Sequence, residues 1–389
     1  MFDNRHFELF QPHETPFYYY DMELLQRTLD LVKTESGHYG YHVHYALKAN
    51  TNPRILQAVQ QTGLGADCVS GNEVLAALDA GFAPKNIVLA GVGKTDKEIK
   101  IAIEEGIFSL NVESLPELKV IGEIATSLGK KATIALRINP NVDANTHKYI
   151  TTGLSENKFG LGVHEIFNAI EIIKSNALLD FAGLHFHIGS QITDLTSFRS
   201  LCVKVNEINS MLQKKNIRPT HINLGGGLGV DYHSPDENPV ADFVNYFKLF
   251  DDFLELLPGQ QVHFEIGRAI VAQCGTLVTR VLFVKAGIKT HFLIVDAGMN
   301  DLIRPALYQA YHKIQNLTRS NEIHDKEFYD VVGPVCESSD CFGKRISLPR
   351  SQRGDLLLIR TAGAYAEAMA STYNLRPVAQ SVFGEKVVV

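Results

Sequence analysis

The feature that most constrains the fold is a regular alternation of strand-like and helix-like segments through the first two-thirds of the chain. The strand-like runs are short and rich in β-branched or aromatic residues, and they lie at 42–47, 65–69, 87–90, 108–112, 132–138, 182–188, 219–224 and 261–266. Helical patterns fill the gaps, for instance 73–78 and 99–105. Eight such units predict an α/β fold in which parallel strands close into a (β/α)8 barrel.

Three of the predicted helices begin with a capping box, in which a hydroxyl accepts from an exposed helix amide and a glutamate reaches back to the amide of the cap residue. The pairs are Ser70 with Glu73, Thr95 with Glu98, and Ser114 with Glu117. These boxes mark the points where strand gives way to helix.

The pattern changes after about residue 271. Strand-like runs at 275–284, 290–296, 328–332 and 355–361 have few long helical patterns between them. An earlier run at 15–20 also has the composition of a strand. We therefore expect a second, mostly β domain over 271–389 that the N-terminal strand of 1–25 joins, with the barrel over 26–270.

Composition and charge exclude several classes of protein. The 389 residues are 45% apolar and 21% charged, with a net charge of −6, which disfavours disorder and nonspecific binding to nucleic acid or anionic membranes. No run of 18 apolar residues is long enough to span a bilayer. The first residues lack the basic-then-apolar order of a secretory signal, and the five cysteines are irregularly spaced. We expect a cytoplasmic location, with neither nucleic acid nor membrane as partner.

In a barrel of this kind the chemistry lies where the strands end, so the residues that follow each run are the first candidates. Lys48 follows the first run, in Tyr45-Ala46-Leu47-Lys48. A lysine at the rim of an apolar strand can lose its proton and bond covalently to a carbonyl cofactor. A solvated surface lysine is the alternative from position alone.

Glycines and a carboxylate follow the last two barrel runs. Gly225, Gly226 and Gly227 come after the seventh, and Glu265-Ile266-Gly267-Arg268 closes the eighth. Loops at these two positions commonly bind phosphate, because glycine lets backbone N–H groups approach the oxygens. An ordinary tight turn is the alternative for the glycines.

The sixth run ends in His185-Phe186-His187, and Ser190 follows. An imidazole at His187 could stack on a planar ring, with the Ser190 hydroxyl on a phosphate. A second His-x-His at 42–44 leaves open a metal-dependent hydrolase, in which paired histidines hold zinc. Packing in the core is the ordinary role of such histidines.

In the β domain, Cys336 lies beside Glu337 and close to Asp340. Nearby carboxylates do not favour a thiolate, so we expect Cys336 to act as a proton donor rather than as a nucleophile. Buried packing is the alternative for a single cysteine.

Together these segments resemble the fold-type III decarboxylases that depend on pyridoxal phosphate. The resemblance extends in order over nearly the whole chain and rests on 45–50, 65–67, 143–153, 157–160, 185–191, 225–227, 265–268, 336–338 and 363–374. Ile266 departs from the family pattern, which has proline there. The resemblance implies decarboxylation of an amino acid by a homodimer whose cysteine loop enters the neighbouring subunit's site.

The resemblance also implies roles for individual residues, with no metal. Cofactor binding falls to Lys48, Asp67, His187, Ser190, Gly225, Gly226, Gly227, Glu265, Gly267, Arg268 and Tyr373. Lys48, His187 and Cys336 are the implied catalytic residues. Substrate binding falls to Arg268, Arg304, Tyr308, Glu337 and Tyr373. The implied substrate is meso-2,6-diaminopimelate, with ornithine or arginine as the alternative within the class and a metal-dependent amidohydrolase outside it.

Overall fold

The computed structural model describes residues 2–142, 158–322 and 324–384, and it divides into two compact units. One unit contains 29–229 and 242–267, and is called the barrel unit below. The other contains 1–28, 230–241 and 268–389, and is called the β unit. The family-like segment 143–153 lies outside the described residues.

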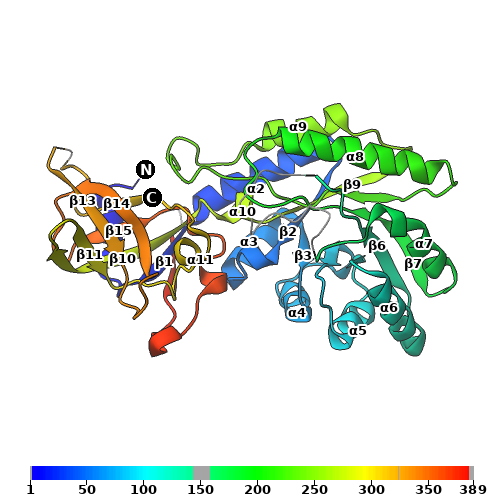
Figure 1. Cartoon of the computed structure of the whole chain (residues 1–389), viewed down its shortest axis with the longest axis horizontal. Coiled ribbons are helices and arrows are strands. Elements are labelled where there is room, and N and C mark those ends of the chain that lie inside the picture. The colour runs from blue at the N-terminus through cyan, green and yellow to red at the C-terminus, as the bar shows by residue number, and fades with distance from the viewer. Residues whose placement is uncertain (1, 143–157, 323, 385–389) are drawn as a thin grey trace. The chain divides into compact units, whose positions relative to one another are not determined.

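The barrel unit contains a closed barrel of eight parallel strands in chain order, which confirms the predicted fold class (Figure 1). Its strands are β2 (His42–Ala46), β3 (Gly65–Cys68), β4 (Ile87–Leu89), β5 (Ser109–Val112), β6 (Ala132–Arg137), β7 (Leu179–His185), β8 (His221–Asn223) and β9 (Gln261–Ile266). Each predicted run overlaps one strand. The sixth differs most, because β7 begins three residues earlier than predicted and ends at His185.

Helices connect successive strands, and in Figure 1 they lie around the outside of the barrel. They are α3 (Pro53–Thr62), α4 (Gly71–Asp79), α5 (Asp96–Glu105), α6 (Leu115–Leu128), α7 (Ile166–Lys174), α8 (Thr196–Gln213) and α9 (Phe243–Phe253). Helix α2 (Met22–His38) precedes β2 and contributes to both units.

The three predicted helix caps are present, but only one is a complete capping box. Thr95 and Glu98 bond reciprocally at the start of α5. At α4 the Ser70 hydroxyl accepts from the Glu73 amide, while the Glu73 carboxylate accepts from the amide of Val69 at 2.6 Å. The glutamate at the start of α6 likewise accepts from the residue before its cap. These two glutamates therefore tie the end of the preceding strand to the helix.

Aromatic packing holds β9 in place. Phe243, Phe247 and Phe250 follow the three-and-four spacing of one face of α9, and all three are buried. The Phe247 and Phe250 rings lie 5.2 Å and 4.9 Å from the ring of Phe264 on β9. Since side chains alternate along a strand, the next residue, Glu265, lies on the opposite side of the strand, inside the barrel.

The β unit contains an eight-stranded sheet in the order β12-β15-β10-β11-β13-β14, with β1 paired to β10 and β16. The strands are β1 (Phe17–Asp21), β10 (Gly275–Ala286), β11 (His291–Val295), β12 (Ile314–Asn316), β13 (Lys326–Val332), β14 (Cys341–Pro349), β15 (Leu356–Ile359) and β16 (Gln380–Gly384). Its helices are α1 (Asn4–Phe10), α10 (Arg268–Val271) and α11 (Arg304–Tyr308). The pairing of β1 with β10 confirms that the N-terminal strand joins this sheet.

Candidate active site

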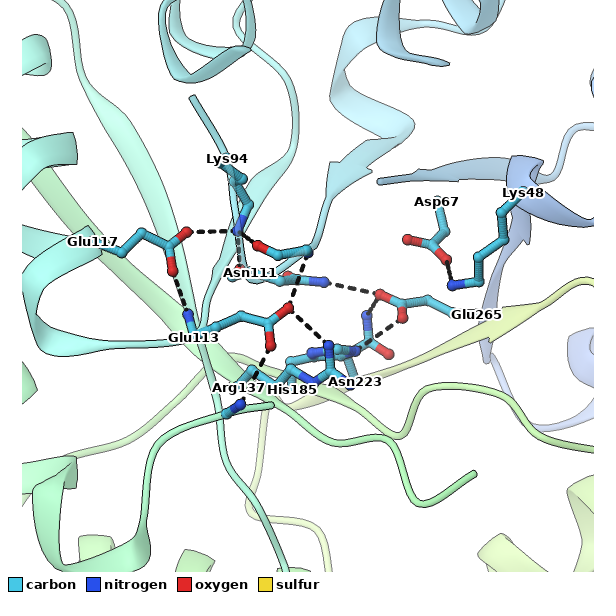
Figure 2. Close-up of polar contacts among 12 residues, drawn as sticks. Lys48, Asp67, Lys94, Asn111, Glu113, Glu117, Arg137, His185, Asn223 and Glu265 are labelled. Atoms are coloured by element: carbon cyan, nitrogen blue, oxygen red, sulfur yellow. Dashed lines mark hydrogen bonds and ion pairs between the residues drawn. The ribbon is translucent and has the colours of Figure 1, made fainter. Parts of the chain in front are cut away.

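A buried carboxylate, Glu265, lies at the centre of the polar residues in the barrel (Figure 2). Asn111 and Asn223 each donate an amide N–H to its Oε1, at 2.9 and 2.8 Å, and His185 donates from Nε2 to Oε2 at 2.9 Å. Burial alone would raise the pKa of Glu265, but His185 and Lys48 lower it below its ordinary value. Glu265 is therefore a fixed negative charge that accepts from three side-chain donors.

Lys48 lies in the turn after β2, with its amine 3.4 Å from Oδ2 of Asp67 on β3. The Lys48 side chain is 39% exposed, whereas Asp67 is fully buried. Burial and the charge of Glu265 raise the pKa of Asp67, and Lys48 opposes this rise. The other oxygen, Oδ1, has no hydrogen-bond partner among the described residues. A reachable amine thus stands beside a carboxylate with unused hydrogen-bonding capacity.

His187 lies two residues beyond the end of β7, not within the strand as the sequence predicted. The chain leaves the strand ladder here, after Phe186 makes a last bond to the carbonyl of Asn223. Nδ1 of His187 accepts from the amide of Gly226 at 3.4 Å. Burial and Arg137 lower the pKa of His187 well below its ordinary value, so the ring is neutral.

The three glycines after β8 stand where a side chain would be strained or would not fit. Gly225 and Gly227 have φ of 66° and 111°, in the region that favours glycine. A Cβ at Gly226 would overlap the carbonyl oxygen of Glu265. Backbone therefore approaches backbone closely here, next to His187, which is the construction that phosphate-binding loops require.

Sequence reasoning missed a second layer of charged residues beneath this site. Nζ of Lys94, whose side chain is 2% exposed, donates to Glu117 at 2.6 Å and to the carbonyl oxygens of Gly91 and Asn111. Figure 2 shows this layer beside Glu265, to which it connects through Asn111.

Glu113 and Arg137 complete the second layer. Glu113 accepts from Arg137 at 2.8 Å and from the amide of Gly91 at 2.9 Å. Lys94, Glu113 and Arg137 all lie at or just after the ends of barrel strands. That position was the available signal.

The β unit has its own buried polar cluster, which contains the predicted substrate residues Arg268 and Arg304. Both guanidinium groups donate to the hydroxyl of Tyr232, at 2.7 and 3.0 Å. Arg304 also contacts Nε2 of His312 at 2.8 Å. Tyr308 lies at the end of α11, the helix that begins with Arg304, and is partly exposed. Tyr232 and His312 were not anticipated from the sequence.

A third group in the β unit is exposed. The Tyr373 hydroxyl donates to Glu337 at 2.7 Å, and this hydrogen bond raises the pKa of Tyr373. The amide of Cys336 donates to the side chain of Asn374 at 3.3 Å. The structure thus brings together the predicted proton donor Cys336 and two predicted substrate residues, Glu337 and Tyr373.

The chain belongs to the family described as pyridoxal-dependent decarboxylases, whose pyridoxal-binding domain matches residues 23–272. It is 52% identical to a diaminopimelate decarboxylase of Bacteroides thetaiotaomicron, covering 97% of this chain and 98% of that protein. The crystal structure of diaminopimelate decarboxylase from Helicobacter pylori complexed with L-lysine matches with a TM-score of 0.92 and 44% identity, over 98% of this chain and 94% of that one. A lysine/ornithine decarboxylase from Vibrio vulnificus, at 22% identity and a TM-score of 0.83, shares the fold.

The family assignment replaces the amidohydrolase alternative and leaves the His-x-His at 42–44 a structural role. His44 bonds to Nδ1 of His263 at 3.0 Å, and the His42 ring stacks on His263 at 4.8 Å. Within the described residues, no helix is long and apolar enough to cross a membrane.

Proposed function

We propose that this protein decarboxylates meso-2,6-diaminopimelate to L-lysine and CO₂, using pyridoxal phosphate. The observation that carries the proposal is the match to a diaminopimelate decarboxylase over nearly the full length of both chains. The buried pair Arg268 and Arg304 also favours a substrate with a distal carboxylate, because guanidinium groups bind carboxylates in a bidentate way.

The barrel residues fit this cofactor. Lys48 offers an accessible amine for covalent attachment, and Asp67 beside it has an unused oxygen. Glu265 is a buried anion suited to a protonated pyridine nitrogen, and His187 is a neutral ring suited to stacking. The proposed phosphate ligands are the Ser190 hydroxyl, the loops at Gly225, Gly226, Gly227 and Gly267, and the side chains of Arg268 and Tyr373.

When bound, pyridoxal phosphate supplies a conjugated ring that accepts the electron pair left by departing CO₂. Glu265 stays ionised and keeps a proton on the ring nitrogen, which maintains the pull on those electrons. Lys48 would hold the cofactor through its amine, and the same amine would move protons during turnover. Cys336 then donates a proton to the α-carbon.

The β unit supplies the proposed substrate contacts. Arg268, Arg304 and Tyr308 take the distal carboxylate, and Glu337, with Tyr373 bonded to it, takes the distal ammonium. In this proposal the barrel unit holds most of the cofactor contacts, and the β unit, which begins again at Arg268, supplies the substrate contacts.

The decisive assay measures lysine and CO₂ released from meso-diaminopimelate, with ornithine, lysine and arginine as competing substrates. We expect efficiencies for ornithine and lysine roughly 10³-fold lower, because unpaired guanidinium groups in a dry pocket cost a few kcal/mol. Equal turnover of ornithine or arginine would overturn the proposal in favour of the alternative decarboxylases.

We also propose a homodimer with shared active sites, which the family resemblance and the exposed position of Cys336 support. Inactive Lys48→Ala and Cys336→Ala subunits, when mixed, should recover about a quarter of wild-type activity. Random exchange makes about half the dimers hybrid, each with one intact site of two. No recovery despite demonstrated subunit exchange would place Cys336 in the site of its own subunit.

We also propose a cytoplasmic location, on the basis of the cysteines. All five cysteines are free thiols, whereas secreted proteins tend to pair theirs. Cell fractionation with an antibody to the protein tests this, and recovery in a secreted fraction would contradict it.

A further inference from the structure

The distal-carboxylate site of the proposed function rests on two arginines, and the structure shows what holds them. Tyr232 belongs to the segment 230–241, which follows the last barrel glycines in sequence but groups with the β unit. Tyr232 is 7% exposed to solvent, and Arg268 and Arg304 are each 6% exposed. One hydroxyl oxygen thus accepts from two buried cations, at 2.7 and 3.0 Å.

The second support for Arg304 is a histidine with a fixed tautomer. Nδ1 of His312 lies 2.8 Å from the carbonyl oxygen of Arg360, and because a carbonyl only accepts, Nδ1 carries the hydrogen. Burial and Arg304 lower the pKa of His312 to about 3, so the ring is neutral and Nε2 is an acceptor. Arg304 therefore donates to Nε2, at 2.8 Å.

These contacts use both N–H groups of one guanidinium nitrogen, Nη1 of Arg304. Within the described part of the chain, Nε and Nη2 of Arg304 have no hydrogen-bond partner, and no carboxylate forms an ion pair with this guanidinium. Nε and Nη2 form the side of a guanidinium that can bind a carboxylate through two parallel hydrogen bonds.

The charges around Tyr232 also indicate that it holds the two arginines. Burial would raise the pKa of Tyr232, but Arg268 and Arg304 lower it below the ordinary value for tyrosine. A hydroxyl oxygen that accepts from both guanidinium groups places negative partial charge between them, which reduces their mutual repulsion and keeps them side by side. The ring of Tyr232 also packs edge-on against His312, with centroids 5.1 Å apart, so the two supports stiffen each other.

We propose that Tyr232 and His312 are positioning residues that hold Arg304 with its Nε–Nη2 side directed to a substrate carboxylate, and that selection of substrates with a distal carboxylate depends on them. This inference rests on the proposed function and deepens it. Neither residue reacts, and each acts through Arg304.

The kinetic test uses the holoenzyme and the variants Tyr232→Phe, His312→Phe and His312→Gln. Tyr232→Phe and His312→Phe should each raise KM for diaminopimelate about 10-fold or more while kcat changes less than about 3-fold. The first variant removes the acceptor of two arginine hydrogen bonds, and the second removes the acceptor of one. His312→Gln keeps an acceptor and should recover part of the loss. If His312→Phe fails to fold, His312→Gln still tests the role of the histidine. Tyr311→Phe, at an exposed tyrosine next in sequence to His312, is the matched control and should match wild type.

A spectroscopic test separates this inference from the proposed function. Tyrosinate absorbance is titrated in wild type and in Tyr232→Phe, and the difference should show one tyrosine that ionises at lower pH than free tyrosine and at higher pH once Arg304 is replaced by alanine. If wild type fails to act on diaminopimelate but the titration behaves as stated, the proposed function fails and the positioning holds. An unchanged KM in Tyr232→Phe, or a fall in kcat alone, overturns the positioning role.

Discussion

The barrel and the β unit each bury a polar cluster, and the two clusters have opposite charge. In the barrel, one anion, Glu265, is surrounded by N–H donors from Asn111, Asn223 and His185. In the β unit, two cations, Arg268 and Arg304, share the single hydroxyl of Tyr232. A buried charge costs free energy unless it is paired and hydrogen-bonded, so these are different solutions to one problem.

The difference indicates what each cluster is built to receive. Glu265 accepts from two amides and one imidazole and stays ionised, so it can serve a positively charged ring nitrogen that arrives with the cofactor. Among the described residues Arg304 forms no ion pair with a carboxylate, which suits it to a substrate carboxylate. The expectation is that the barrel cluster governs kcat and that the arginine pair governs substrate choice.

The largest effect should come from Lys48→Ala. Loss of the attachment amine should reduce turnover by roughly 10³-fold or more and remove the visible absorption of the lysine-linked cofactor, with the fold retained. Borohydride reduction and peptide mapping locate the attachment directly. Lys158→Ala is the control, and cofactor attached to Lys158 would contradict the assignment.

Next in size is Glu265→Gln. Losing the charge should lower kcat about 10²- to 10³-fold with a smaller change in KM, because the ring nitrogen loses its anionic partner. Glu73→Gln, a barrel carboxylate that accepts from the amide of Val69, is the matched control for folding. A variant that raised KM while keeping kcat would assign Glu265 to the substrate and erase the contrast between the clusters.

Arg304→Ala tests the arginine pair of the β unit. We expect efficiency for diaminopimelate to fall about 10²-fold through KM, and the gap to lysine to narrow, with cofactor absorbance intact. The measurement is kcat/KM for both substrates. An unchanged preference would show that the arginine pair does not read the distal carboxylate.

The last prediction concerns stability in acid rather than activity. His44 in the barrel and His312 in the β unit are buried, and their pKa values are lowered to about 4 and about 3, mainly by burial. As the pH falls below the unfolded-state pKa near 6.5, these histidines are protonated in the unfolded chain but stay neutral in the native chain. The free energy of unfolding therefore decreases as the pH falls toward the native pKa values of about 4 and about 3. Each histidine should contribute about 1.4 kcal/mol of lost stability per pH unit between pH 6 and pH 4. Urea unfolding followed over that range tests this, and a flat profile would refute it.

The sequence predicted the barrel well because most of its strands lie in short runs rich in apolar residues between helical patterns. It missed β14 (Cys341–Pro349), whose inner residues Gly343, Lys344 and Arg345 do not read as a strand. That strand exists because β13 supplies its pairing partner, a tertiary effect that local composition does not record.

The same distinction applies to the site. Lys48, Glu265 and the glycines stand at strand ends and were predicted, with roles taken from the family. Tyr232 and His312 lie far apart in sequence, and only the folded β unit brings both to Arg304. Tyr232 is 72 residues from Arg304, and His312, eight residues from it, is oriented by the carbonyl of Arg360, so sequence spacing gave no signal for either contact.

The close approach of Gly226 to Glu265 has a consequence for how this chain can change. Any side chain at position 226 would push against the backbone of β9 at the residue that carries the central anion. In a library containing every amino acid at each glycine, position 226 should tolerate almost none, whereas Gly93, which has open space around it, should accept many. Substitutions can therefore accumulate at surface turns such as Gly93, whereas position 226 must remain glycine for Glu265 to keep its place.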